Sequence, residues 1–146
     1  MAQPVGSIIG TRELSREGSR GKPVTVTLGK PRKRADGDWE CAFRIAGLRV
    51  RAVQYGYGVD AIQALTTALE GIRVTLERSG QRLAWIGGEA GDAGFERLVP
   101  TSFGPAFTSR LNRLIDREIN RVVQRLERQH LRRSRRAASR TQGSRR

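Results

Sequence analysis

Two glycines stand directly before a predicted helix in the stretch QYGYGVDAIQALTTAL, residues 54–69, where a phosphate-binding loop could lie. Helix N-termini bind phosphates through backbone N–H groups, which glycines make accessible. The stretch lacks both the Gly-Lys-Ser/Thr of a Walker loop and the third glycine of a dinucleotide-binding turn. Asp60 would also place a negative charge where the phosphate should sit. We therefore interpret Gly56 and Gly58 as permitting a tight strand-to-helix turn, and Asp60 as the helix N-cap.

Other side chains that could carry out chemistry are scattered along the chain. Cys41, the one cysteine, falls on the apolar side of a predicted strand, which favours an unreactive packing residue over a nucleophile. His130, the one histidine, lies among arginines that provide no pocket for a Ser-His-Asp triad. Glu89 and Asp92, in a glycine-rich loop, fall short of the ligand set of a calcium site. We expect no catalytic residue, metal or cofactor, and an enzyme of unrecognised type stays open as a third function.

The positive charge of the chain is concentrated near its C-terminus. The 146 residues have a formal net charge of +14, with 25 arginines and 3 lysines. Residues 110–146 hold 13 arginines and three carboxylates, so this quarter of the chain accounts for +10. Such an excess indicates an acidic partner, either nucleic acid or an acidic protein. Arginine suits phosphate because its planar group donates two parallel hydrogen bonds, although a codon bias toward arginine would produce the same ratio.

Residues 101–132 have the pattern of an amphipathic helix, with Pro105 suited to its first turn. Apolar residues recur on one side at the helical period, and arginines gather on a neighbouring side. The apolar residues are Leu111, Leu114, Ile115, Ile119, Val122, Val123 and Leu126. The arginines expected to contact nucleic acid, including four just beyond Leu131, are Arg113, Arg117, Arg121, Arg125, Arg128, Arg132, Arg133, Arg135 and Arg136.

We expect the apolar side of this helix to pack on the body of the chain or on a second copy, which would make a homodimer. The arginine side would then contact phosphates without reading bases. A membrane-surface helix is not favoured, because no Trp or Phe lies on the apolar side between residues 111 and 126. Residues 133–146 have the composition of a disordered basic tail. No stretch predicts a signal peptide or a transmembrane helix, so we expect a cytoplasmic protein.

Residues 1–100 predict the α+β body that must position these side chains. Alternating apolar and polar residues predict strands at 7–14, 23–29, 39–45 and 48–54, the last two joined as a hairpin. Because the alternation is one-sided, we expect an antiparallel meander with one covered face.

A helix at 60–79, ended by Gly80, is predicted to cover that face of the sheet. Its apolar stripe is Ile62, Leu65, Leu69, Ile72 and Leu76. A short strand or hairpin at 83–99 is expected to precede the long basic helix.

The body also resembles a known family. The stretch GDWECAFRIAGLRVRAVQYGYGVDAIQALTTALEGIRVTLE has the motif W-x-C-x-F-R-I-x-G, with Trp39 and Cys41, followed by G-x-D-x-x-Q-A-L, with Gly58 and Asp60. With RLAWIGG at 82–88, it resembles a small uncharacterised bacterial domain family over residues 10–100 or so. The resemblance supports the fold, gives these four residues structural roles, and implies no activity.

The sequence thus favours a non-enzymatic bacterial accessory protein whose arginine-rich C-terminal arm binds nucleic acid without sequence specificity. The alternative is a protein-interaction module, such as an antitoxin-like or immunity-like partner.

Overall fold

The computed structural model describes residues 5–18, 21–49, 52–99 and 102–143, with the side chains of the last helix described as far as residue 136. The chain divides into two units, Met1–Leu98 and Val99–Arg146. Each unit is described by itself.

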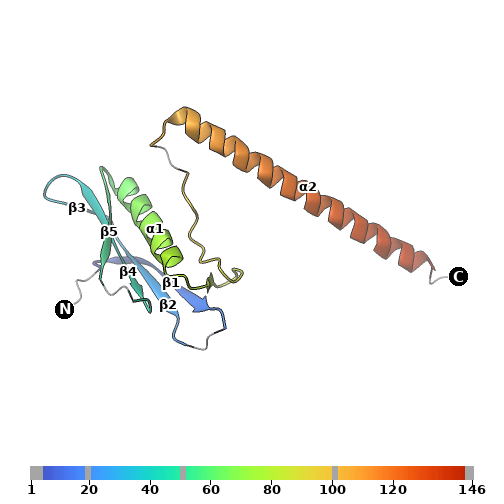
Figure 1. Ribbon diagram of the computed structural model, residues 1–146, viewed down its shortest axis with the longest axis horizontal. Helices are drawn as coiled ribbons and strands as arrows, with labels where there is room; N and C mark the ends of the chain where they lie inside the picture. The colour runs from blue at the N-terminus through green and yellow to red at the C-terminus, as the bar shows by residue number, and fades with distance from the viewer. Residues whose placement is uncertain (1–4, 19–20, 50–51, 100–101, 144–146) are drawn as a thin grey trace. The chain divides into compact units, whose positions relative to one another are not determined.

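The described residues of the first unit form one antiparallel sheet of six strands (Figure 1). The strands are β1 (Ile8–Arg16), β2 (Val24–Gly29), β3 (Arg32–Lys33), β4 (Trp39–Ala46), β5 (Gln54–Gly58) and β6 (Leu83–Trp85). Successive pairing of β1, β2, β4 and β5 makes the predicted meander. The two-residue β3 pairs with one end of β4, and β6 pairs with β1. The predicted α+β class and antiparallel sheet are confirmed.

Helix α1 (Ala61–Arg78) lies along one face of this sheet (Figure 1). Its first turn is capped as predicted, because the Asp60 carboxylate accepts a hydrogen bond from the N–H of Gln63 at 2.7 Å. The Gln63 side chain in turn accepts from the N–H of Val59 at 2.8 Å. The helix ends at Ser79, and Gly80 follows with a φ of +66°, a conformation that favours glycine.

The strand predicted at 48–54 is wrong. Residues 47–49 and 52–53 lie in a loop, and the predicted strand positions Val50 and Arg51 lie outside the described residues. The strand begins instead at Gln54, and its pairing with β4 continues to Gly58 opposite Trp39. Gly56 and Gly58 therefore belong to a strand and not to a turn. The strand was missed because its inward positions hold glycine, so QYGYG shows no apolar alternation.

The buried side of α1 also differs from the predicted stripe. Ile62 is 77% exposed and Leu69 is 37% exposed. The cause is β5, since a Cβ on Gly56 would lie 2.2 Å from the backbone nitrogen of Ala68. Small residues on both elements let the helix approach this strand closely, which turns Ile62 toward solvent. The hydrophobic residues of α1 that are buried are Ala64, Ala68, Ile72 and Leu76.

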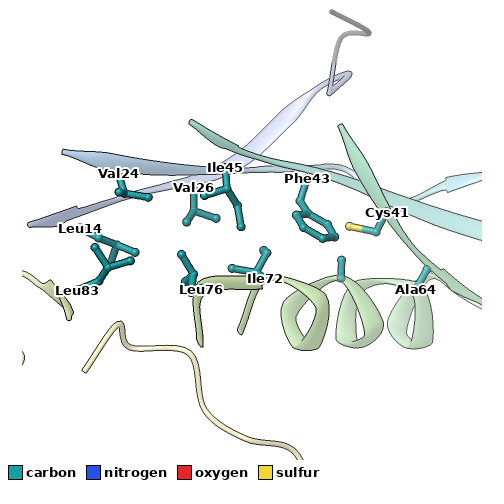
Figure 2. Close-up of a cluster of buried hydrophobic side chains, with 11 residues drawn as sticks. Leu14, Val24, Val26, Cys41, Phe43, Ile45, Ala64, Ile72, Leu76 and Leu83 are labelled. Atoms are coloured by element: carbon teal, nitrogen blue, oxygen red, sulfur yellow. The ribbon is translucent and has the colours of Figure 1, made fainter. Parts of the chain in front are cut away.

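The hydrophobic core lies between α1 and the covered face of the sheet (Figure 2). Alternate residues of β4 point into it, and Trp39 packs half-buried at its edge. The side chains of the sheet that belong to this core are Leu14, Val24, Val26, Cys41, Phe43, Ile45 and Leu83. Strands β2 and β4 thus bury the side that their period-2 pattern predicts.

The short strand predicted within 83–99 is β6, and the rest of that range is irregular. Arg12 of β1 holds this segment against the sheet. Its guanidinium carbon lies 5.6 Å from the ring centre of Trp85 and 4.6 Å from that of Phe95. The same group donates hydrogen bonds to the carbonyl oxygens of Ala93 and Gly94. These contacts replace the strand pairing that would otherwise anchor the segment.

The described part of the second unit contains one helix, α2 (Pro105–Gly143). Its start agrees with the position of Pro105 in the first turn. The backbone of residues 133–143 is helical, where the sequence predicts a disordered tail, and residues 144–146 lie outside the described part. Alanine and arginine are strong helix formers, so Ala137 and Ala138 among arginines favour continuation of the helix. No helix in the described part of the chain is long and apolar enough to cross a membrane.

Candidate nucleic-acid interface

The nine arginines predicted to contact nucleic acid all lie on α2 and are all exposed. Seven of them follow one another at steps of three or four residues: Arg113, Arg117, Arg121, Arg125, Arg128, Arg132 and Arg136. At 100° per residue these seven fall within an arc of about 140°, and at 1.5 Å per residue they extend over about 35 Å. We call them the arginine stripe.

The contacts of the arginine stripe run along the helix. Arg121 forms an ion pair with Glu118. The Nε of Arg117 donates to the carbonyl of Arg113 at 3.3 Å, and that of Arg128 to the carbonyl of Gln124 at 3.1 Å. Each guanidinium has five N–H donors, so one such bond leaves others to reach a phosphate. The stripe is therefore positively charged and accessible along its length.

The carboxylates of α2 are arranged so that two of the three lie off the arginine stripe. By the helical period, Asp116 and Glu127 fall about 40–60° outside its arc. Glu118 lies at its edge and is the partner of Arg121. One side of α2 thus presents a field of a single sign, which attracts polyanions.

The apolar side of α2 is exposed within its unit. The exposed fractions are 45% for Ile115, 54% for Ile119 and 57% for Leu126. The second unit contains no other described helix or strand that could cover these side chains. The predicted packing of this side on the body or on a second copy stays a prediction.

The residues given structural roles lie in the first unit. Trp39 and Cys41 belong to β4, and Gly58 and Asp60 lie where β5 leads into α1. The Cys41 Sγ lies 3.3 Å from the carbonyl oxygen of Gly29, and burial raises the pKa of the thiol. No group of three or more metal-ligating side chains occurs among the described residues.

Comparison with known families identifies the family of the first unit. Residues 10–97 match the family model described as a domain of unknown function, DUF6968. The chain belongs to this family. The matched region contains most of β1, all the other strands and α1, so it confirms the resemblance to a family without known activity and leaves α2 outside. No curated protein and no solved structure matches the chain.

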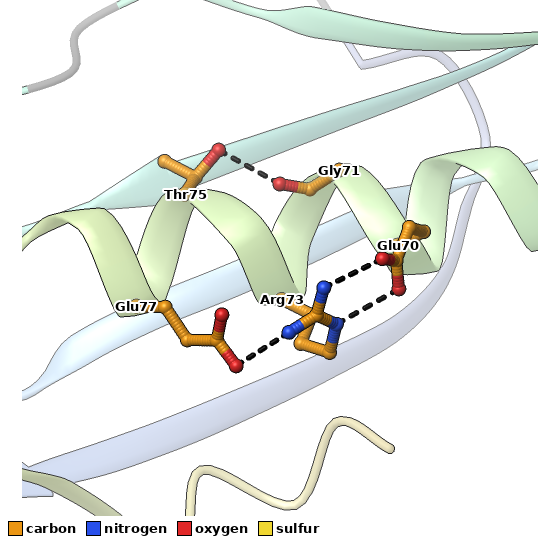
Figure 3. A network of polar contacts seen from close by, with 5 residues as sticks. All are labelled: Glu70, Gly71, Arg73, Thr75 and Glu77. Atoms are coloured by element: carbon orange, nitrogen blue, oxygen red, sulfur yellow. Dashed lines mark hydrogen bonds and ion pairs between the residues drawn. The ribbon is translucent and has the colours of Figure 1, made fainter. Parts of the chain in front are cut away.

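The DUF6968 body contains a buried arginine that sequence reasoning missed. Arg73 of α1 is 8% exposed and donates two hydrogen bonds to the Glu70 carboxylate, at 2.6 and 2.8 Å (Figure 3). A third bond joins it to Glu77, one turn further along the helix. The bonds from Arg73 lower the pKa of Glu70. Because the guanidinium is held by carboxylates of its own helix, we assign it a structural role.

The second feature that sequence reasoning missed is a pair of tyrosines on β5 of the DUF6968 body. Tyr55 and Tyr57 are neighbours on one side of the strand, with ring centroids 6.2 Å apart. Arg34, in the turn after β3, lies over the Tyr57 ring. The period-2 spacing of the tyrosines in QYGYG is typical of a strand, but the two glycines favour a turn at the same position.

Cys41 of the DUF6968 body should react slowly with a thiol reagent in the native protein and rapidly after unfolding. The thiolate is the reactive form, and burial both hinders access and raises the thiol pKa, so less thiolate is present at neutral pH. The check is the labelling rate with a chromogenic disulfide reagent in buffer and in denaturant, at the same pH. Equal rates in the two conditions would mean that Cys41 is accessible and would reopen a covalent role.

Proposed function

We propose that this protein is a non-enzymatic accessory protein of the bacterial cytoplasm, in which α2 binds nucleic acid without sequence specificity. The observation that carries the proposal is the arginine stripe, exposed along one side of a continuous helix. The family match ends before α2, so the proposal assigns the binding to a segment attached to the DUF6968 body.

The physical basis of this binding is counterion release. Each phosphate neutralised by an arginine frees a condensed cation, which favours association at low salt. The stripe is about 35 Å long, close to one helical turn of duplex DNA at about 34–36 Å. Contacts of this kind position a protein on the backbone and carry no direct sequence information. Weak binding to many sequences is the expected behaviour.

The experiment that tests the proposal is a titration of labelled duplex at several salt concentrations. We expect affinity to fall steeply with salt and to differ little between unrelated sequences. Full-length protein that does not bind at low salt, or whose binding ignores salt, would refute the proposal. The arginine stripe would then face solvent or an acidic protein.

A protein-interaction module, antitoxin-like or immunity-like, is the second candidate function. The observation that favours it is the apolar side of α2, which is exposed along the segment from Leu111 to Leu126. Exposed apolar stripes of this kind mark contact surfaces. A homodimer through α2 would satisfy this side while leaving the arginine stripe accessible, so the two candidate functions are compatible.

Replacing Leu114, Ile119 and Val122 together by serine should dissociate a homodimer or destabilise the body. Burying an aliphatic side chain contributes about 1.5–3 kcal/mol, so losing three removes most of such an interface. The measurements are mass by light scattering and the midpoint of thermal unfolding. A matched control replaces Asn120 and Gln124, on the polar side, by serine. If the triple variant behaves like this control in both measurements, the apolar side packs on neither the body nor a second copy.

A further inference from the structure

The sheet face opposite α1 carries both tyrosines of the chain. A Cβ on Gly56 or Gly58 would meet α1, so the alternation of β5 places Tyr55 and Tyr57 on the opposite face. β5 pairs with β4 on one side and, among the described strands, is an edge strand of the sheet. The two rings are inclined by 24°, and Tyr57 is 51% exposed. An aromatic surface therefore lies at the accessible edge of this face.

Arginines flank this aromatic surface. The guanidinium of Arg34 lies 5.3 Å from the ring centre of Tyr57. Arg32 and Arg34 both contact Glu40, at 2.6 and 3.6 Å, and Arg34 also contacts Asp36. In this cluster the two arginines balance the charge of the two carboxylates, Glu40 and Asp36.

A further cation on the same face is Arg44. It alternates with the buried Phe43 and Ile45 along β4, which puts it on the side of the tyrosines. It is exposed and has no ion-pair partner among the described residues. Its register partner on β2 is Thr27, which is buried. The face therefore combines an exposed and a half-buried tyrosine ring, planar guanidinium groups and a positive charge without a carboxylate partner among the described residues.

We propose that this face of the DUF6968 body binds single-stranded nucleic acid, with a base stacked at Tyr57 and phosphates near Arg32 and Arg44. The proposal rests on the proposed nucleic-acid function, but it uses residues other than those of α2. Bases of a single strand expose their faces to aromatic rings and to guanidinium planes, and a positive surface holds the backbone. Bases of a duplex are stacked on each other and cannot reach these rings.

The charge of the face favours nucleic acid over a protein partner. Protein interfaces are also enriched in tyrosine and arginine, so the preference for nucleic acid rests on the positive charge of Arg44, which has no ion-pair partner among the described residues. Here the exposed tyrosine has a guanidinium over its ring, which is the arrangement that sequence-tolerant binding of single strands uses.

The test compares Tyr57 variants of the full chain on two labelled probes, an oligouridylate of about 16 nucleotides and a duplex of the same length. Tyr57→Ala should weaken binding of the single strand about tenfold, the effect of removing one stacked base, and leave binding of the duplex unchanged. Tyr57→Phe should bind like the wild type, because stacking needs the ring and not the hydroxyl. Tyr57→Leu keeps apolar area on β5 and should lose affinity like Tyr57→Ala. Thermal unfolding midpoints equal to that of the wild type confirm that the variants are folded.

The two probes separate this inference from the function proposed for α2. Salt-dependent duplex binding together with single-strand binding that ignores the Tyr57 substitutions would overturn the inference and leave the α2 proposal standing. Duplex binding that is absent, with single-strand binding that still depends on the Tyr57 ring, would support the inference and refute the α2 proposal. Equal losses on both probes in Tyr57→Ala would also overturn the inference, because stacking on this ring acts on the single strand alone.

Discussion

Neutralising six arginines of the arginine stripe should strongly reduce the salt dependence of duplex binding. The six are Arg113, Arg117, Arg121, Arg125, Arg128 and Arg132, each replaced by glutamine. If each contacts one phosphate, the log–log salt slope of the wild type should be about −5, from roughly −0.9 per phosphate. The affinity of the wild type should then fall about 10³-fold between 50 and 200 mM salt. The glutamine variant should bind more weakly at every salt concentration and show a much smaller slope, to which the remaining arginines, such as Arg133, Arg135 and Arg136, still contribute.

A lysine variant at the same six positions is the matched control. It retains the charge and loses the bidentate geometry of the guanidinium. Since counterion release depends on charge, the lysine variant should keep a slope close to that of the wild type. Circular dichroism should show equal helix content in all three proteins. A glutamine variant with the slope of the wild type would contradict the assignment of phosphate binding to α2.

Gly56→Ala should destabilise the DUF6968 body by about 3 kcal/mol or more, at the upper end of the overpacking effects seen in protein cores. The added Cβ would lie 2.2 Å from the backbone nitrogen of Ala68 and 2.6 Å from the backbone oxygen of Ala64. These are main-chain atoms of α1, so no side-chain rotation relieves the contact and the helix must move away from β5. The measurement is the free energy of unfolding from a urea titration.

The control for this substitution is Gly10→Ala in β1. A Cβ at Gly10 would meet no atom within 4 Å, and the residue does not have a positive φ. It should change the free energy of unfolding by less than about 1 kcal/mol, since it acts mainly on the unfolded chain. Equal effects of the two substitutions would mean that α1 does not approach β5 as closely as described.

Two strands and the helix ends of the body could be predicted because their signals are local. Period-2 alternation located β2 and β4, and it chose their buried sides correctly. Asp60 and Gly80 act through backbone groups within one helical turn, so both ends of α1 were found. The exposed arginines of α2 were also found, since charge and helical period depend on no distant contact.

Features that depend on contacts between elements were missed. The side of α1 that is buried depends on Gly56 and Gly58 of β5. Because these residues have no Cβ, α1 can approach β5 closely at these two positions. The apolar residue types along α1 predicted that Ile62 and Leu69 would be buried. The close approach of β5 buries Ala64 and Ala68 instead. The anchoring of the irregular segment after β6 by Arg12 was likewise missed, because it joins residues about 80 positions apart in the chain.

The sequence by itself determined the α+β order of elements, the buried position of Cys41, the capping of α1 and the accumulation of arginines on one side of α2. Only the tertiary structure decided that QYGYG is an edge strand, and with it that Tyr55, Tyr57 and Arg34 share the face opposite α1. The physical reason is that apolar alternation and helical period are patterns of residues close together in the sequence, so they can be identified without knowledge of the tertiary contacts. The face on which a glycine-rich strand places its side chains is decided by the helix that packs against it.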